Sequence, residues 1–350
     1  MSIQLKYDRR NFIAHSVRTL IASEFALTGL DQIPGSGIQG NTIVSPATTS
    51  NMSFTQIKQI EAGVLNIGYV DEGPATGTVV MLLHGWPYDI HTYSSVTPLL
   101  VAKGYRVIVP YLRGYGTTRF LSAETPRNGQ QSVIAADIIA LMDALKIQKA
   151  IIGGCDWGAR TANIIAALWP ERTKAMVSVS GYLIGNRKMA NIPLTPSAEL
   201  QWWYQYYFAT ERGKAGYEKN TFDFARLIWL IASPKWKFDE ATFRRTADSF
   251  NNPDHVNIVI HNYRWRLGLA EGEQKYNELE MRLDDGPVIT VPSITLEGDA
   301  NGAPHPPDGS YANKFSEKYA HRTITGGIGH NLPQEAPKAF ADAIIDADNL

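Results

Sequence analysis

The chain has 350 residues, of which 44% are hydrophobic and 19% are charged, and its formal net charge at pH 7 is −1. This balance is normal for a soluble globular enzyme and excludes a wholly disordered chain. Without a block of basic residues, neither a nucleic acid nor an anionic membrane is expected as a partner, and no apolar run reaches the roughly 20 residues of a membrane span. Cys155 is the only cysteine, which excludes an internal disulfide and a multi-cysteine zinc site.

Residues 1–54 are interpreted as an N-terminal extension. Arg9 and Arg10, followed by Asn-Phe-Ile, resemble a twin-arginine export signal, although charged residues interrupt the apolar stretch behind them. The alternative is an amphipathic helix over residues 9–27 that packs on the domain. Residues 31–52 are rich in Gly, Pro, Ser, Thr and Asn and are interpreted as a linker. A working signal predicts a periplasmic protein, and a packed helix predicts a cytoplasmic one.

From residue 55 onward, predicted strands and helices alternate. Some of the strand-like runs are apolar throughout, as expected when both faces of a strand are buried; the runs cover residues 64–70, 78–83, 105–110, 149–153, 174–180 and 288–296. Residues 132–145 and 159–168 are predicted helices, and a last helix begins near Pro333. The alternation predicts an α/β fold, a mostly parallel sheet with helices on both faces.

The alternation breaks between residues 186 and 288. This stretch is helical in pattern and contains five of the eight tryptophans: Trp202, Trp203, Trp229, Trp236 and Trp265. The simplest interpretation is a helical cap inserted into an α/β core that consists of residues 55–185 and 289–350. The site is then expected between the cap and the core, over the carboxyl ends of the strands.

Asp156 lies in a Gly-x-Asp-x-Gly pattern at 154–158, after a predicted buried strand and before a predicted helix. This is the form of a nucleophile elbow, with a carboxylate where many hydrolases have serine. The glycines permit a sharp turn, and the helix that follows directs its N–H groups and positive dipole end at the nucleophile. The alternative is an ordinary turn in which Asp156 caps the helix. Cys155 is interpreted as a small packing residue.

Two further loops favour the nucleophile. The HGWP segment at 84–87 follows a buried strand, where this elbow finds its second oxyanion-hole donor, so the backbone N–H groups of Trp86 and Trp157 are expected to form the hole. His84 is expected to shape this loop and not to transfer protons. His330 lies in a Gly-rich loop before the last helix, and it follows the nucleophile in chain order, as the catalytic base of this arrangement must.

These motifs, together with RGYG at 113–116, DWG at 156–158 and GxGHNLPQE at 327–335, resemble the epoxide hydrolase and haloalkane dehalogenase branch of the α/β-hydrolase superfamily over residues 55–345. The resemblance implies that Asp156 attacks carbon to form an alkyl ester, and that His330 activates the water that hydrolyses this ester. It implies no metal and no organic cofactor. The expected partner is a small-molecule substrate, an epoxide of apolar or aromatic character, and a homodimer is left open.

The resemblance also assigns roles within the cap. Opening an epoxide releases an alkoxide, so a proton donor must stand opposite the nucleophile. Epoxide hydrolases use two cap tyrosines, and the matching positions here are Tyr204 and Tyr263. The alternative is that both tyrosines only pack. The remaining residues expected around the substrate pocket are His84, Gly85, Pro87, Gln205 and Tyr207.

The acid of the triad departs from the family's pattern. The usual spacing after Gly298 places the acid at position 301, which is Asn301 here, whereas Asp299 lies two residues earlier. Either Asp299 has taken over, or Asn301 orients His330 as a neutral partner. A neutral partner stabilises an imidazolium less well and should slow ester hydrolysis more than ester formation.

The function that these residues favour is hydrolysis of an epoxide to a vicinal diol. One alternative is a haloalkane or haloacid dehalogenase that uses the same Asp156, with Trp157 and a cap aromatic holding the halide. A second alternative, from a different class, is a non-catalytic ligand-binding homologue, which only the altered acid position supports.

Overall fold

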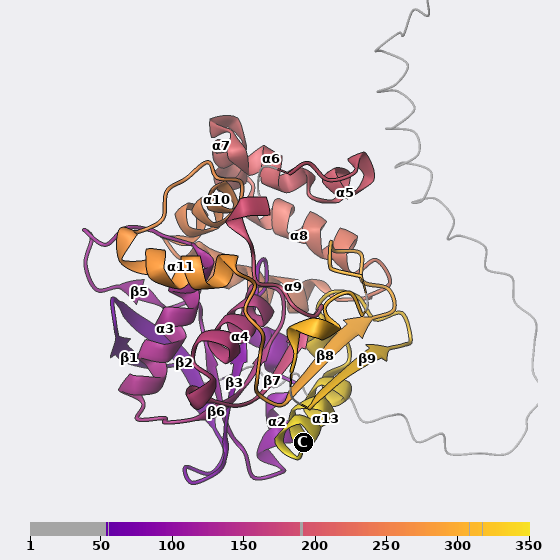
Figure 1. Ribbon diagram of the computed structural model, residues 1–350. Coiled ribbons are helices and arrows are strands. Elements are labelled where there is room, and N and C mark those ends of the chain that lie inside the picture. Colours follow the sequence, from indigo (N-terminus) through magenta and orange to yellow (C-terminus); the bar gives the residue numbers. More distant parts are fainter. Residues whose placement is uncertain (1–53, 55, 190–191, 308, 317) are drawn as a thin grey trace, which may run out of the picture. The chain divides into compact units, whose positions relative to one another are not determined.

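The computed structural model describes residues 54, 56–189, 192–307, 309–316 and 318–350 (Figure 1). The export-signal motif, the alternative helix at 9–27 and the linker at 31–52 lie outside the described residues. Within these ranges, no helix combines the length and the apolar character that a membrane crossing requires.

The core is a mixed sheet in the order β1-β2-β4-β3-β6-β7-β8-β9, with β5 paired to β2. β1 (Lys58–Ala62), β2 (Leu65–Glu72) and β5 (Arg119–Phe120) form the antiparallel part. The other strands are parallel to one another: β3 (Val79–Leu83), β4 (Arg106–Pro110), β6 (Ala150–Gly154), β7 (Thr173–Val179), β8 (Ser293–Gly298) and β9 (Tyr319–Ile324). This confirms the predicted mostly parallel sheet.

Right-handed crossovers place the core helices on both faces of the sheet. The chain moves from β3 to β4 in one direction along the sheet and from β6 to β7 in the other, so α2 (Thr97–Val101) and α4 (Trp157–Leu168) lie on opposite faces. α3 (Gln131–Ala144) packs beside α4, and α13 (Pro337–Asp348) packs beside α2. The short α12 (Leu332–Glu335) precedes α13, so the predicted last helix is two helices.

One predicted strand is shorter and lies later than expected. The apolar run at 288–296 becomes β8 only from Ser293, while Ile289 forms an isolated bridge to Phe315. The two prolines at 287 and 292 explain this, because proline cannot donate to a strand ladder.

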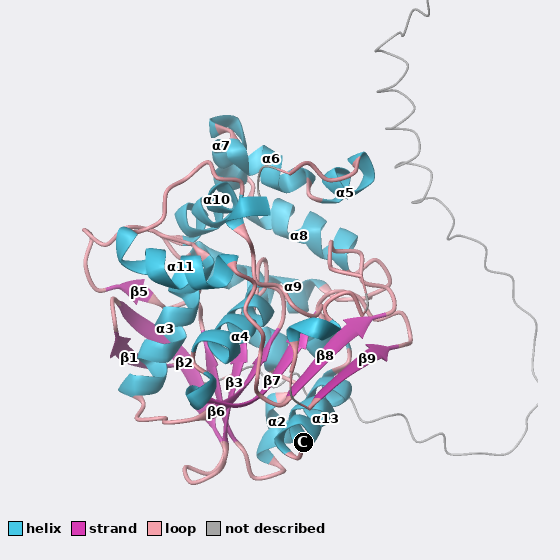
Figure 2. Cartoon of the chain, in the orientation of Figure 1, coloured by secondary structure: helices cyan, strands magenta, loops and turns pink. Residues whose placement is uncertain are grey.

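The helices of the cap all lie between β7 and β8. Figure 2 shows most of them gathered beyond one end of the core strands. They are α5 (Pro196–Gln201), α6 (Trp203–Ala209), α7 (Glu211–Lys219), α8 (Thr221–Ala232), α9 (Glu240–Ala247), α10 (His255–Arg266) and α11 (Asn277–Asp284).

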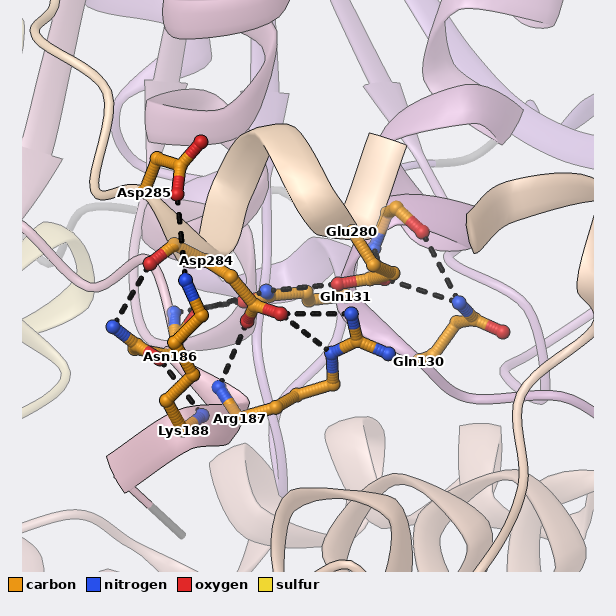
Figure 3. A network of polar contacts seen from close by, with 10 residues as sticks. Gln130, Gln131, Asn186, Arg187, Lys188, Glu280, Asp284 and Asp285 are labelled. Atoms are coloured by element: carbon orange, nitrogen blue, oxygen red, sulfur yellow. Dashed lines mark hydrogen bonds and ion pairs between the residues drawn. The ribbon is translucent and has the colours of Figure 1, made fainter. Parts of the chain in front are cut away.

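Polar contacts hold both ends of the cap to the start of α3 (Figure 3). Glu280 of α11 is fully buried and accepts hydrogen bonds from the side chains of Gln130 and Gln131, and from a backbone N–H in the first turn of α3. A carboxylate there also complements the positive end of the helix. Nearby, Arg187 makes a two-pronged ion pair with Asp284, at 2.7 and 3.0 Å. The two connections between core and cap are therefore joined to each other and to the core.

Candidate active site

Asp156 occupies a strained turn between β6 and α4. Its φ of 56° and ψ of −119° lie where side chains are rarely found, a strain of about 1–3 kcal/mol. A Cβ on Gly154 would lie 2.2 Å from the carbonyl oxygen of Gly158, and one on Gly158 would lie 1.7 Å from that of Leu83. Both positions therefore require glycine. The Asp156 side chain makes no helix-capping hydrogen bond, so the alternative of an ordinary capping turn is not what is observed.

The two oxygens of the Asp156 carboxylate have different surroundings. Oδ1 accepts a hydrogen bond from the backbone N–H of Trp86 at 2.8 Å, and Oδ2 lies 3.4 Å from Nε2 of His330. Burial opposes ionisation of Asp156. His330, the Trp86 N–H and the charge of Arg160 together outweigh burial and hold the pKa of Asp156 below its usual range. The group is thus an ionised carboxylate at neutral pH, the form in which a carboxylate can act as a nucleophile.

The backbone around Gly85 closes on the same carboxylate oxygen. A Cβ at Gly85 would lie 2.4 Å from Asp156 Oδ1 and 2.7 Å from the backbone nitrogen of Trp157. The N–H groups of Trp86 and Trp157 therefore lie close to one point, although Trp86 is the one that donates to the carboxylate within the described chain. An oxyanion hole needs both donors directed at one oxygen, and the structure shows such a bond from Trp86.

His84 is a structural histidine. It is fully buried, its Nδ1 lies 3.1 Å from the carbonyl oxygen of Gly85, and its Nε2 accepts a hydrogen bond from the Leu112 N–H at 3.2 Å. Burial lowers the pKa of His84 to about 4. A neutral ring with both nitrogens engaged joins two loops and is not available for proton transfer.

Ser233 and Glu335 hold the loop that carries His330. Of these two residues, only Glu335 lies in a motif that the sequence analysis identified. The His330 N–H donates to Ser233 Oγ at 3.0 Å. Glu335 accepts from the Ser233 hydroxyl and from the backbone N–H groups of Gly329 and Asn331. Glu335 belongs to the GxGHNLPQE segment, whereas Ser233 comes from the end of α8 with no local sequence signal.

Asp299 hydrogen-bonds to the loop before His330 and not to His330 itself. Its carboxylate accepts the backbone N–H groups of residues 326–328 at 2.8 to 3.1 Å, and these bonds hold the pKa of Asp299 below its usual range. The carboxylate is exposed to solvent. Its visible effect is on the shape of the loop.

Asn301 also has no hydrogen bond to His330. Its Nδ2 donates to Glu297 Oε1 at 2.7 Å and to Ser180 Oγ at 3.2 Å, and its Oδ1 accepts from the Ala303 N–H at 2.9 Å. Nδ1 of His330 is buried and has no hydrogen-bond partner among the described residues. The two positions that the sequence offered for the acid are therefore both committed elsewhere.

A cavity of about 320 Å³ opens above Asp156 and His330. Most of its surface is apolar. It is lined by Trp86, Asp156 and His330 of the core, by the cap residues Leu200, Gln201, Trp202, Trp203, Tyr204, Ile228, Ile231 and Ala232, and by Gly302, Ala303 and Pro304. The five further residues expected around a pocket do not line this cavity: His84, Gly85, Pro87, Gln205 and Tyr207.

Tyr204 of α6 and Tyr263 of α10 meet over Trp86. Their ring centroids are 5.4 Å apart, and they lie 5.3 and 5.2 Å from the Trp86 ring. Burial raises the pKa of both hydroxyls, and the negative charge of Asp156 acts in the same direction. Tyr204 lines the cavity, whereas Tyr263 is almost fully buried behind it. Two protonated phenols therefore lie within the electrostatic reach of Asp156.

A chain of hydrogen bonds that the sequence did not reveal ties Trp86 to the cap. The Trp86 indole N–H donates to the Tyr217 hydroxyl at 2.9 Å, and this hydroxyl lies 2.8 Å from Nε2 of His255. Nδ1 of His255 lies 3.0 Å from the Gly114 carbonyl oxygen. Because a carbonyl can only accept, Nδ1 carries the proton and Nε2 accepts from Tyr217. The chain fixes the residue whose N–H contacts Asp156.

Known proteins resemble this chain in sequence and in fold. The alpha/beta hydrolase fold family matches residues 78–216. The crystal structure of a candidate epoxide hydrolase from Klebsiella pneumoniae subsp. pneumoniae is 64% identical to this chain, covers 85% of it and 98% of its own chain, and superposes with a TM-score of 0.84. Epoxide hydrolase 2 of Siraitia grosvenorii is 28% identical over 305 residues, which are 81% of this chain and 94% of that protein.

Two other curated relatives match over a shorter segment. Epoxide hydrolase 3 of Siraitia grosvenorii is 36% identical over 125 residues, and Epoxide hydrolase B of Mycobacterium tuberculosis is 30% identical over 149 residues. The chain spans 39% and 41% of the length of these two proteins. With its sheet order, its nucleophile elbow and these similarities, the chain belongs to the epoxide hydrolase branch of the α/β-hydrolase fold family.

Proposed function

We propose that this protein hydrolyses an epoxide to a vicinal diol through a covalent ester on Asp156. The observation that carries the proposal is the pair of protonated tyrosines, Tyr204 and Tyr263, beside an ionised carboxylate. A carboxylate can attack an epoxide carbon only if the oxygen that departs is given a proton, and a phenol with a raised pKa remains able to donate one.

In the first step, a carboxylate oxygen of Asp156 forms a bond to an epoxide carbon. The carbon–oxygen bond of the ring breaks, its electron pair goes to the epoxide oxygen, and a tyrosine supplies the proton. In the second step, Nε2 of His330 takes a proton from water, and the water oxygen attacks the ester carbonyl carbon. The negative charge on Oδ1 is stabilised by the Trp86 N–H. Collapse releases the diol, whose oxygen takes the proton from His330. The second proton of the water remains on the Asp156 carboxyl group, and its transfer restores the tyrosine and the carboxylate.

The cavity favours an apolar or aromatic epoxide. Its volume of about 320 Å³ is at the lower end of small-molecule pockets, and its walls include three tryptophan, two isoleucine and one leucine side chains. A compact substrate such as styrene oxide matches these walls and leaves the three-membered ring to approach Asp156.

Dehalogenation is a second candidate because of one observation. The indole N–H of Trp157 is buried and has no hydrogen-bond partner among the described residues, so it is a free donor for a leaving halide, although Trp157 itself does not line the cavity. Its ring centroid lies 5.9 Å from that of Tyr263. Consumption of 1-bromobutane in preference to styrene oxide would favour this candidate.

The direct test is to trap the ester. With styrene oxide, His330→Gln should accumulate an adduct in intact-protein mass spectrometry, because the ester forms and is not hydrolysed. Asp156→Asn should form none. An adduct mapped to Cys155 would contradict the proposal.

The tyrosines are tested by the rate of ester formation. Tyr204→Phe and Tyr263→Phe should each slow it, by up to about 100-fold for loss of one donor, and the double variant should lose most of the rate with a non-additive effect. Tyr206→Phe, a change of the same kind on the exposed side of α6, is the matched control. A double variant that forms ester at the wild-type rate would leave the tyrosines as packing residues.

A further inference from the structure

A buried carboxylate on a strand of the core has no part in the steps above. Glu297 belongs to β8, and only 3% of its surface is exposed. Its Oε1 accepts from Asn301 Nδ2 at 2.7 Å and from the adjacent backbone N–H at 3.1 Å. Its Oε2 is buried and has no hydrogen-bond partner among the described residues; His305 Nε2 lies 3.9 Å away. An unsatisfied buried carboxylate oxygen is costly, which suggests that the atom has a function.

The unsatisfied oxygen of Glu297 and the unsatisfied Nδ1 of His330 belong to adjoining segments. A Cβ at Gly298 would lie 2.3 Å from the carbonyl oxygen of Ile328 and 2.7 Å from that of Gly329. The Ala300 N–H donates to the Ile328 carbonyl at 2.8 Å. The end of β8 therefore runs directly against the backbone that leads into His330.

The other carboxylates near His330 are already engaged. Asp299 directs both oxygens at backbone N–H groups of residues 326–328. Glu335 accepts from Ser233, and both of its oxygens accept from backbone N–H groups of the His330 loop. On the far side of the imidazole, Asp156 is the nucleophile. Of these carboxylates, Glu297 is the one that has an oxygen without a hydrogen-bond partner among the described residues.

We propose that Glu297 is the positioning residue whose negative charge supports His330 when the imidazole becomes cationic during ester hydrolysis. This inference rests on the proposed function. Water gives its proton to Nε2, Nδ1 already carries one, and the resulting imidazolium is stabilised by the buried carboxylate. Asn301 holds that carboxylate in place through Oε1. The charge that the family's spacing predicts at position 301 is thus supplied from four residues earlier, with the amide as its support.

Glu297→Gln tests this in single-turnover experiments with styrene oxide, in which ester formation and ester decay are measured separately by quenched mass spectrometry. The variant keeps the volume and an oxygen for Asn301. Formation should stay within about threefold of wild type, while decay should slow by about 100-fold or more, as loss of an orienting carboxylate does in related triads. The acid limb of the decay rate should move to lower pH, because removing a negative charge favours the neutral imidazole.

A second variant covers the case in which Glu297→Gln does not fold. Glu297→Gln combined with Asn301→Asp exchanges the acid and the amide, and it keeps the net charge and the number of hydrogen-bonding groups. The ester of this double variant should decay at a rate within about tenfold of wild type, because a negative charge is again present beside the histidine. His305→Ala is the control for the other histidine near Glu297 Oε2, and it should leave the rate of ester decay unchanged.

Each outcome separates this inference from the proposed function. Three results would overturn the role of Glu297 and leave ester formation intact. They are ester decay at the wild-type rate in Glu297→Gln, slow decay in the exchanged pair, and a loss of decay in His305→Ala equal to that in Glu297→Gln. Absence of any ester in His330→Gln would instead overturn the proposed function itself.

Discussion

The hydroxyl of Tyr217 is predicted to stabilise both the fold and the nucleophile. It accepts from the Trp86 indole at 2.9 Å and donates to His255 at 2.8 Å, in a region where all three side chains are fully or almost fully buried. Burial lowers the pKa of His255 to about 3, so this ring stays neutral and needs the donor. Tyr217→Phe removes the central atom and leaves one donor and one acceptor without partners.

The size of the effect follows from those two groups. An unsatisfied buried hydrogen-bonding group costs about 1–3 kcal/mol, so the two together should lower the free energy of unfolding by about 2–4 kcal/mol after partial relaxation. At about 2–4 °C per kcal/mol for a large domain, the melting temperature should fall by about 4–16 °C. Ester formation should fall by about tenfold, which corresponds to roughly 1.4 kcal/mol, because a loosened Trp86 holds Asp156 Oδ1 less firmly.

Calorimetry and single-turnover ester formation measure the two effects. Trp86→Phe and the double variant Trp86→Phe with Tyr217→Phe complete a cycle, and the coupling between the two residues should be about 0.5–3 kcal/mol. Tyr206→Phe again serves as the control on the cap surface. If Tyr217→Phe has the melting temperature of wild type and forms ester at the same rate, the chain of hydrogen bonds does not hold Trp86 in place.

Two further predictions concern pH. Ester formation should stay level from about pH 5 to pH 10, because Asp156 keeps its charge below the usual carboxyl range while Tyr204 and Tyr263 keep their protons above the usual phenol range; a decline in the burst rate near pH 9 would argue against the tyrosine donors. Asp299→Asn should lower the melting temperature at neutral pH with little change in ester decay. Because the pKa of Asp299 is lowered by folding, its contribution is fully present above its unfolded pKa, so the difference from wild type should shrink as the pH falls below about 4 and disappear below the folded-state pKa; a slowed ester decay would return Asp299 to the role of the acid.

The sequence predicts this fold where one local cause dominates. Val80, Met81, Leu82 and Leu83 are fully buried in the sheet, so their apolar run is unbroken and the strand is recognisable. The elbow is equally local, since a Cβ at Gly154 or Gly158 would collide with neighbouring backbone. β1 was missed because most of its residues face solvent at the edge of the sheet, and its apolar pattern is correspondingly weak.

The surroundings of the site depend on contacts between distant residues and are less predictable. Trp86 and Tyr217 are separated by 131 positions, and no residue near either one indicates that they meet. The cavity walls show the same limit. Leu200, Ile231 and Pro304 lie on three segments that only the tertiary fold brings together. Aromatic cap residues were expected at the pocket, but sequence spacing did not show which side of α6 would face it.

The acid position shows why a motif alone can mislead about charge. A pattern match asks which residue stands at position 301, and the answer is an amide; the physical requirement is a negative charge that is buried, rigid and close to the imidazole. Glu297 meets the first two conditions by its place in β8, where it is buried and its backbone pairs with Thr323 of β9. A carboxylate on a strand is held more precisely than one on the following loop, and it needs one further contact to fix its rotamer. Asn301 supplies that contact at 2.7 Å, so the amide has a structural role that does not require contact with His330.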